Sequence, residues 1–261
     1  MRPICLASSS AGNCYVFEFD VKGTPTRIMV ECGVPMSDIY KGLSKNGIGI
    51  DTIKACLITH AHQDHCKAVY DLIKIGVPVF ASKPTLDALK IESEELFHLK
   101  PKRVVEGIYV MGFWVEHDID GAMGFIIKTQ TECVIFINDH KRWNVNLKKF
   151  KPNYVFIECN YFHKVVYAQY YELKKLKESN IDLEQLKEVN IKIAQHERNI
   201  NAHCSLHGTL KGLKKLDLSE CKAIFLMHLS DRYANEYKMK NQVQFETGIL
   251  TYVCLKYGGI K

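Results

Sequence analysis

Four side chains able to bind a metal ion crowd into one short stretch of the sequence, His60, His62, Asp64 and His65. They follow the hydrophobic run 53–59 and precede an amphipathic, helix-like segment. In an extended segment, residues two positions apart point the same way, so His60 and His62 can share one ion. The turn into the helix redirects Asp64 and His65 towards a second ion. Packing does not explain so dense a group, so the spacing predicts two adjacent metal ions rather than a solvated loop.

A two-metal site needs further ligands, ideally including a carboxylate able to bridge the ions. Three other apolar runs end in suitable residues, namely His117-Asp118, Asp139 and His228. Loops that follow strands are where α/β proteins assemble sites from distant parts of the chain. Each residue alone is ambiguous, because an isolated histidine after a strand is more often a surface or core group. Together with the cluster, they are expected to complete the site.

Short β-rich runs alternate with helix-like segments, which favours an α/β fold. Strands are expected at residues 4–7, 14–19, 27–32, 53–59, 77–81, 109–115, 124–129, 133–138, 154–158, 223–228 and 249–255. Helices are expected at 37–44, 66–75, 84–97 and 206–216, and in the stretch from 168 to about 197. Asn180 and Asp182 predict a break in that stretch followed by a new N-cap. Without repeats or a shift in composition, we expect one domain over residues 1–261 with a helical insert at about 165–200.

The composition excludes several classes of protein. Hydrophobic residues make up 47% and charged residues 25%, which is typical of a globular chain and excludes disorder and collagen-like repeats. The ten cysteines include no C-x-x-C pair and no secretory signal precedes them, so we expect reduced thiols in the cytoplasm. No apolar stretch approaches the roughly 18 residues that cross a bilayer, so no membrane partner is expected. The net charge of +6 permits nucleic acid as a partner without requiring it, and a homodimer stays open.

The residues above resemble the metallo-β-lactamase superfamily, in particular its YycJ-like (WalJ) branch. The resemblance is carried by THAHQDH at 59–65, HD at 117, ND at 138, HLS at 228, the start LASSSAGNCYVFE and the triplets Glu31-Cys32-Gly33, Glu158-Cys159-Asn160 and His203-Cys204-Ser205. It spans nearly the whole chain and implies a four-layer αββα sandwich. The small size and the Lys- and Ile-rich composition would suit a phage or firmicute member of the branch.

The resemblance also implies roles for individual residues. One divalent ion would be held by His60, His62 and His117, the other by Asp64, His65 and His228, with Asp139 as the bridge. Imidazole and carboxylate ligands suit Zn or Mn. Asp64 would orient or deprotonate the nucleophile, and His203 would contact the phosphate or the leaving group. Substrate contacts are expected from Ser9, Ser10, Asn13, Asn160 and Ser230.

Three positions depart from the branch pattern and bear on substrate placement rather than on the metals. Glu31 replaces an aspartate, Tyr161-Phe162 stands in place of His-Asp, and His140 replaces a small residue. A basic run, Lys141, Arg142, Lys148, Lys149 and Lys151 around Trp143, either tracks a nucleic-acid backbone or is a solvated face. The sequence leaves both interpretations open.

Two adjacent ions lower the pKa of bound water, and the resulting hydroxide attacks phosphorus or carbonyl carbon. The leading hypothesis is therefore a dinuclear phosphodiesterase with DNA or another phosphodiester as its substrate, exonuclease-like in action. The alternative keeps the two ions but acts on small cyclic nucleotides, as phage anti-defence enzymes do. A third hypothesis, a non-catalytic metal-binding module, is disfavoured because Asp64 and His65 are both present.

Overall fold

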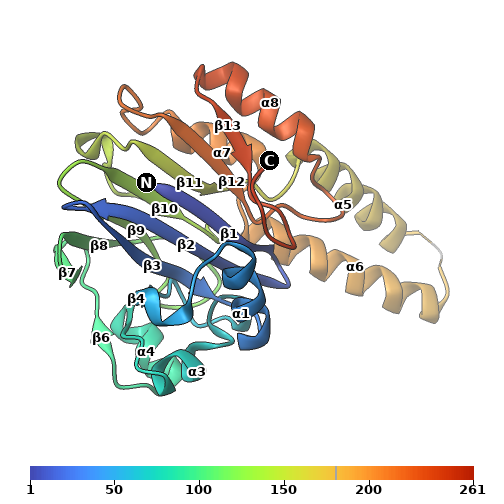
Figure 1. The fold of residues 1–261 in the computed structure, drawn as a ribbon. Coiled ribbons are helices and arrows are strands. Elements are labelled where there is room, and N and C mark those ends of the chain that lie inside the picture. Colours follow the sequence, from blue (N-terminus) through green and yellow to red (C-terminus); the bar gives the residue numbers. More distant parts are fainter. Residues whose placement is uncertain (180) are drawn as a thin grey trace.

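Two β-sheets pack face to face at the centre of the computed structural model, which describes residues 1–179 and 181–261 (Figure 1). The first sheet has the strand order β1-β2-β3-β4-β5-β6 and the second the order β13-β12-β11-β10-β9-β8-β7. The strands of the first sheet are β1 (Arg2–Ser9), β2 (Gly12–Val21), β3 (Thr24–Cys32), β4 (Ile53–Leu57), β5 (Val79–Ala81) and β6 (Glu94–Glu95). Those of the second are β7 (Lys102–Val105), β8 (Ile108–Trp114), β9 (Met123–Lys128), β10 (Cys133–Ile137), β11 (Tyr154–Glu158), β12 (Ala223–Met227) and β13 (Thr251–Val253).

Each sheet changes from antiparallel to parallel pairing partway across. In the first sheet, β1, β2 and β3 form an antiparallel meander, and β3 to β6 then run parallel. In the second, β7 to β10 are antiparallel and β10 to β13 are parallel. Parallel neighbours need crossover connections, which the helices supply. Because parallel strands end at one edge, the loops after them gather there.

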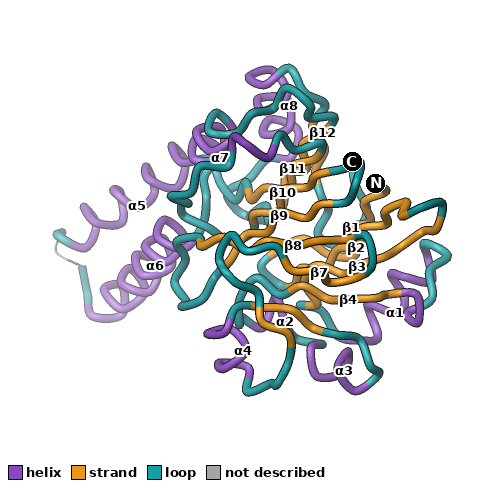
Figure 2. Tube along the Cα trace, turned by 90° about the vertical axis from the view of Figure 1, so that its left-hand side faces the viewer, coloured by secondary structure: helices purple, strands orange, loops and turns teal. Residues whose placement is uncertain are grey.

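Helices cover the outer face of both sheets (Figure 2). They are α1 (Met36–Lys45), α2 (Gln63–Cys66), α3 (Val69–Lys74), α4 (Lys83–Leu89), α5 (His163–Lys177), α6 (Leu183–Ala202), α7 (Leu206–Leu213) and α8 (Glu236–Thr247), with short 3-10 turns η1 (Ile50–Thr52) and η2 (Lys148–Phe150). Among the described residues, no helix combines the length and apolar character needed to cross a membrane.

Three apolar clusters define the layers. The inner cluster lies between the sheets and is rich in aromatic rings, among them Phe17, Phe125 and Phe136. A second cluster joins the first sheet to α1, α3 and α4, and a third joins the second sheet to α7 and α8. Burial of apolar surface on both faces of each sheet is the main force that holds such layers together. The four-layer αββα sandwich expected from the sequence is confirmed.

The helices α5 and α6 form an arm that projects beyond the sheets in both views (Figures 1 and 2). The Asp182 side chain accepts a hydrogen bond from the Gln185 amide at 2.8 Å, which confirms the predicted N-cap. The predicted break at Asn180 lies outside the described residues. Most of the arm is exposed, and the buried side chains of α6 are Val189, Ile193, His196 and Ala202.

Several elements differ from the sequence-based expectation, among them strand β6, which lies inside an expected helix. The helix expected over 84–97 ends at Leu89, because Lys90 adopts a left-handed conformation (φ 54°) that stops it. The helix expected over 66–75 is two helices, α2 and α3. Strand β7 and helix α8 were not predicted at all. For α8 a signal existed, since the Asn235 side chain caps its first turn by accepting from the Lys238 amide.

Candidate metal centre

The seven predicted metal ligands all follow the carboxyl ends of strands. The cluster from His60 to His65 follows β4, His117 follows β8, Asp139 follows β10 and His228 follows β12. The structure brings them together as two adjoining groups, His60 with His62 and His117, and Asp64 with His65, Asp139 and His228. Within each group, one ligand atom per residue lies within 4.8 Å of all the others. Such groups can hold divalent metal ions.

Three imidazole rings converge in the first group. His62 Nδ1 lies 3.1 Å from His60 Nε2 and 3.3 Å from His117 Nε2. His60 and the His117 side chain are buried, whereas the His62 side chain is 27% exposed. Burial lowers the pKa of both His60 and His62, so these rings are neutral and keep a lone pair for a metal ion.

Two carboxylates and two imidazoles make up the second group. Asp139 Oδ2 lies 3.2 Å from His65 Nε2, and Asp139 Oδ1 lies 3.4 Å from His228 Nε2. The same carboxylate is 3.9 Å from His117 Nε2 of the first group, so it faces both groups as a bridging ligand must. Burial would raise the pKa of Asp139, but His228 and His65 outweigh it and hold the pKa well below its usual range. Asp139 is therefore a carboxylate.

Hydrogen bonds from behind orient two of the imidazoles. His117 Nδ1 donates to the Ala202 carbonyl at 2.9 Å, and its Nε2 lies on the side of the other ligands, 3.3 Å from His62 Nδ1. The Thr59 hydroxyl donates to Glu31 Oε1 at 2.5 Å, and it can accept from His60 Nδ1 at 2.8 Å. Partners of this kind fix the tautomer and the direction of metal-binding histidines.

Glu31 supports both groups at once. It is fully buried, and its Oε1 lies 3.2 Å from His65 Nδ1 as well as next to Thr59. Burial would lower the pKa of His65, but Asp139 and Glu31 together raise it well above its usual value. These carboxylates therefore surround His65 with negative charge that a cation can balance. The sequence marked Glu31 only as a departure from an aspartate, so its position behind the ligands is a finding of the structure.

Three residues of the site have left-handed backbone conformations, Glu31 (φ 62°), Asp139 (φ 40°) and His228 (φ 55°). For residues other than glycine such conformations cost about 1–3 kcal/mol and cluster at functional sites. Next to Glu31, Gly33 lets α2 approach β3, because a Cβ there would lie only 1.7 Å from the Asp64 carbonyl oxygen. The strained backbone at these residues and the close contact between α2 and β3 fix the directions of these side chains.

Buried polar atoms without a partner provide a test of whether the residues fit a metal. Three buried atoms among the described residues make no hydrogen bond, namely His65 Nδ1, Asp139 Oδ1 and His228 Nε2. Leaving such atoms unsatisfied is costly, and ligation would satisfy Asp139 Oδ1 and His228 Nε2. Their convergence in one group, together with the nitrogen and oxygen donor set, fits divalent metal ions.

His203 lies beside the second group and is held by Glu158. Its Nδ1 donates to Glu158 Oε1 at 2.7 Å, and its ring centroid lies 5.0 Å from that of His228. Burial would lower the pKa of His203, but the Glu158 carboxylate overcomes this and raises the pKa to about 9. His203 is therefore a protonated imidazole at neutral pH.

The buried Glu158 also accepts from two backbone amides, His140 at 2.8 Å and Cys204 at 3.1 Å. It therefore ties the loop after β10 to the start of α7. Burial lowers the pKa of His140 to about 4, so this ring is neutral. His140, which departs from the branch pattern, is fully buried behind the metal groups and packs against Trp143.

A cavity of about 270 Å³ opens above the metal groups. It is lined by Ser10, His62, Asp64, His117, Asp139, Gln195, Arg198, Asn199, His203 and His228. The three residues from α6 were not predicted, and their helical spacing gave no signal that they would reach the site. Arg198 Nε lies 3.6 Å from Asp118 Oδ2, and Asp118 Oδ1 lies 3.1 Å from His117 Nε2. The arm therefore places a guanidinium next to the metal ligands.

Of the five residues expected to contact substrate, Ser10 lines this cavity. The other four make contacts within the protein. Asn13 Nδ2 donates to the carbonyls of Ser9 and Asp64, and Asn160 Nδ2 donates to the His228 carbonyl at 2.8 Å. The Ser230 hydroxyl accepts from the amides of the turn that follows it. In the basic run, Trp143 is 3% exposed and packs beneath Lys215, so its ring is not available to stack on a base.

Comparison with known proteins agrees with this fold. Residues 9–125 match the metallo-beta-lactamase superfamily. The exodeoxyribonuclease WalJ of Streptococcus pneumoniae is 28% identical over 123 residues, which cover 43% of this chain and 44% of that protein. The exodeoxyribonuclease YycJ of Bacillus anthracis is 25% identical over 142 residues (51% and 52%), and the ribonuclease J of Mycolicibacterium smegmatis is 28% identical over 137 residues (44% and 24%). The chain spans about half or less of the length of these curated relatives.

Solved structures share the fold over the whole chain. The zinc-bound PqqB of Methylobacterium extorquens covers 100% of this chain and 99% of its own, with a TM-score of 0.66 and 12% identity. The short form of human tRNase Z covers 88% and 94%, with a TM-score of 0.56 and 13% identity. The family match over residues 9–125 and this shared fold confirm the resemblance seen in the sequence. Among the curated proteins the chain is similar to both the YycJ and WalJ exonucleases and the ribonucleases J.

Proposed function

We propose that the protein is a metal-dependent hydrolase that cleaves phosphodiester bonds of nucleic acid with two divalent ions, Zn or Mn. The observation that carries this proposal is the composition of the cavity. Five of the seven candidate metal ligands line it, and the Arg198 guanidinium of the arm stands at its side. A guanidinium next to a metal site suits an anionic phosphodiester better than a neutral lactam or thioester.

The relatives support nucleic acid as the substrate class. The similar regions belong to proteins described as exodeoxyribonucleases and as ribonucleases J. That description applies to those proteins, and each aligned region covers only part of the relative. The free thiols support the cytoplasm as the working compartment, since all ten cysteines are unpaired and nine of them are buried.

The residues of this chain would share the chemical work. Two divalent ions, when bound, would activate water and stabilise the charge that develops on the phosphate. Asp64 would orient the attacking water by accepting its hydrogen bond, because His228 and His65 more than offset the effect of burial and hold the pKa of Asp64 far below its usual value. His203, held as a cation by Glu158, would donate a proton to the leaving oxygen. Arg198 would bind a non-bridging phosphate oxygen.

A second candidate keeps this chemistry but changes the substrate to a cyclic mononucleotide. The size of the cavity favours it, since about 270 Å³ lies near the lower end of pockets that enclose small molecules. A polynucleotide needs additional binding surface outside the cavity, whereas a cyclic mononucleotide does not.

The test is a paired hydrolysis assay with Mn²⁺ or Zn²⁺. It offers 5′-labelled single-stranded and double-stranded DNA alongside cyclic mononucleotides, with Asp64→Ala as the control. Progressive loss of the DNA label with the native protein alone supports a nuclease that works from an end. Opening of the cyclic nucleotides alone supports the second candidate. If neither substrate reacts, the proposal is wrong and a non-catalytic metal-binding module becomes the better explanation.

A further inference from the structure

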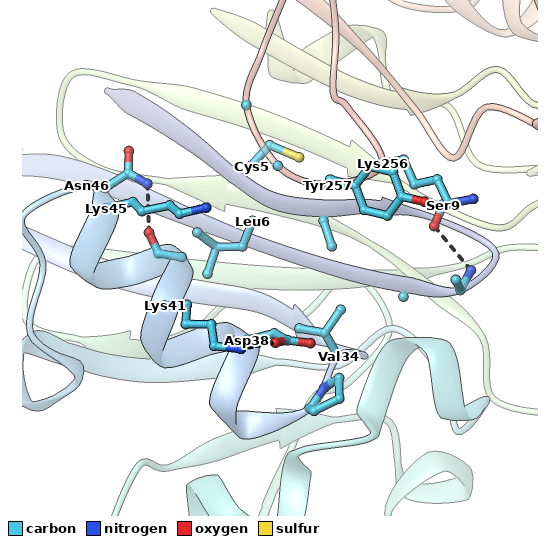
Figure 3. Close-up of a pocket in the computed structure, with 17 residues that line it drawn as sticks. Cys5, Leu6, Ser9, Val34, Asp38, Lys41, Lys45, Asn46, Lys256 and Tyr257 are labelled. Atoms are coloured by element: carbon cyan, nitrogen blue, oxygen red, sulfur yellow. Dashed lines mark hydrogen bonds and ion pairs between the residues drawn. The ribbon is translucent and has the colours of Figure 1, made fainter.

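A second, larger cavity of about 550 Å³ lies outside the metal site (Figure 3). Its walls are β1, helix α1 and the loop that follows β13, and its lining includes Leu6, Val34, Lys41, Lys45, Lys256 and Tyr257. Figure 3 shows Leu6 between the lysines of α1 and the ring of Tyr257. We call this cavity the α1 groove. Its volume falls within the range of about 300–1,000 Å³ that is typical of ligand pockets.

The α1 groove begins where the metal cavity ends. The turn between β1 and β2 separates the two, because Ser10 lines the metal cavity while Ser9 and Ala11 line the groove. A second connection runs through an ion pair between Lys256 of the groove and Asp231, which lies three residues beyond the ligand His228. A chain-like substrate held at the metals can therefore continue over the turn and into the groove.

More lysines than carboxylates line the α1 groove. Lys41 and Lys45 are one helical turn apart on α1, so they lie on the same face. Lys41 pairs with Asp38 at 3.4 Å, and both side chains are largely exposed. Exposed pairs of this kind contribute little to stability and are readily exchanged for a phosphate. In the part of the chain that the structure describes, Lys45 has no carboxylate partner within 4.0 Å.

The loop at the other wall adds an aromatic ring on a fixed backbone. Tyr257 is 88% exposed, far more than a core tyrosine. The loop is bound to β1 through the Gly259 amide, which donates to the Cys5 carbonyl at 2.9 Å. Gly258 (φ 87°) permits this approach, since a Cβ there would lie 2.8 Å from the Leu6 carbonyl oxygen. An exposed ring beside lysines is the combination that holds single-stranded nucleic acid, in which bases stack and phosphates meet cations.

We propose that the α1 groove binds the single-stranded polynucleotide next to the phosphate that is cut. Lys41, Lys45 and Lys256 contact backbone phosphates, and Tyr257 stacks on a base. This inference rests on the proposed function and extends it, because it names a strand longer than the metal cavity can hold as the preferred substrate. It also favours nucleic acid over cyclic mononucleotides, which do not reach beyond the turn.

The experiment compares Lys45→Ser with Lys74→Ser in the metal-loaded protein. Both lysines are exposed and both lie in the last turn of a helix, α1 and α3, so the pair is matched in charge and position. Fluorescence anisotropy measures the affinity for a labelled, phosphorothioate-linked thymidine decanucleotide, which resists hydrolysis, over a series of salt concentrations. Loss of one phosphate contact in a single strand lowers the slope of log affinity against log salt by about 0.7. We expect that change for Lys45→Ser and none for Lys74→Ser.

A second pair of variants tests the stacking role. Tyr257→Ala is expected to weaken binding of the decanucleotide about fivefold or more, and Tyr257→Phe is expected to restore it, because stacking needs the ring and not the hydroxyl. Tyr237→Ala is the matched control, since Tyr237 is also a largely exposed tyrosine but lies on α8. Equal effects of the groove and control variants, or no effect of the groove variants, would show that the groove does not bind the strand.

Hydrolysis of bis(p-nitrophenyl) phosphate separates this inference from the proposed function. This small diester fits the metal cavity alone, so Lys45→Ser and Tyr257→Ala should leave its kcat/KM unchanged. If the native protein cuts this diester and the groove variants bind the decanucleotide normally, the groove proposal is wrong and the hydrolase proposal stands. If the native protein does not cut this diester, but the groove variants lose decanucleotide binding, the hydrolase proposal is wrong and the groove stands as a binding site.

Discussion

The floor and the side wall of the metal cavity are built in contrasting ways. The floor consists of strand-end residues, and several of their side chains are almost fully buried, such as His117 and His228 at 1% exposure. The wall is helix α6 of the projecting arm, where the Arg198 side chain is 72% exposed. Buried ligands are fixed by packing and by hydrogen bonds from behind, whereas an exposed arginine is free to move towards a bound anion. The floor is suited to hold metals and the wall to select the substrate.

The two regions are joined by contacts in addition to the Arg198–Asp118 pair. The Ala202 carbonyl at the end of α6 accepts from His117 Nδ1, and Asn201 Oδ1 accepts from Lys141 Nζ at 3.2 Å. The arm thus supports one metal ligand with its backbone while it presents Arg198 to the cavity. If the regions are separable, changes in the floor should remove metal and turnover together, and changes in the wall should alter only substrate affinity.

The largest effect is expected for Asp139→Ala. Loss of the carboxylate that faces both ligand groups should reduce kcat by roughly a thousandfold or more and lower the metal content, because the bridge holds the two sites together. Metal analysis and steady-state kinetics measure both quantities, and circular dichroism checks the fold. Asp120→Asn, a change at an exposed carboxylate outside the two groups, is the control. Undiminished activity of Asp139→Ala would rule out the two-ion centre.

The second-largest effect is expected for removal of the metal ions, which should destabilise the protein. Ligation stabilises the folded state by about 4 kcal/mol when the metal concentration is a thousand times its Kd. For a chain of this length, 1 kcal/mol shifts Tm by about 2–4 °C, so a chelator should lower Tm by about 8 °C or more. Differential scanning fluorimetry with and without chelator measures the shift. An arm variant such as Arg198→Ala should show the same shift, and a smaller one would mean that the wall also holds the metal.

Glu31→Gln tests the role of the carboxylate that lies behind the candidate metal ligands. Removal of its charge should weaken metal binding by about 10–100-fold, because Glu31 orients His60 through Thr59 and faces His65. Competition with a chromophoric chelator gives the affinity. Glu18→Gln is the comparison variant, since Glu18 pairs with Arg27 away from the centre. Equal metal affinity in both variants would assign Glu31 to packing alone.

Arg198→Ala should raise KM for a phosphodiester by about tenfold and leave metal content unchanged, since a charge-assisted hydrogen bond is worth roughly 1.5–3 kcal/mol before solvent competes. Arg198→Lys should recover only part of the affinity, because lysine lacks the planar fork of arginine. Lys192→Ala is the control on the same helix, where Lys192 pairs with Glu188. A fall in metal content would show that wall and floor act as one unit.

The smallest effect is expected for the double change Lys148→Ala and Lys149→Ala. Both lysines are exposed on η2 and neither lines the metal cavity, so only nucleic-acid affinity should fall, by about two- to threefold. A salt titration of DNA binding measures it. If the titration is unchanged, the basic run is a solvated face, and the α1 groove and Arg198 are the better candidates for contacts with the backbone.

The sequence by itself determined the class of fold and singled out the candidate metal ligands. His60, His62, Asp64 and His65 are close in the chain, so their spacing alone gives their proximity, and the strand ends at His117, Asp139 and His228 are marked by apolar runs. Such signals are local, and local patterns of spacing and hydrophobicity are readable without a structure. The alternation of apolar runs likewise predicted most of the strands.

Only the tertiary structure decided what surrounds those ligands. Glu31 lies behind His60 and His65, and Arg198 reaches the metal cavity from helix α6, which is far along the chain from the cluster His60 to His65. Neither residue carries a local signal, because an isolated charged residue in a strand or on an exposed helix is common. The α1 groove likewise exists only because the loop after β13 packs against β1, a contact between the two ends of the chain. Contacts of that kind depend on how the layers pack, which no short stretch of sequence encodes.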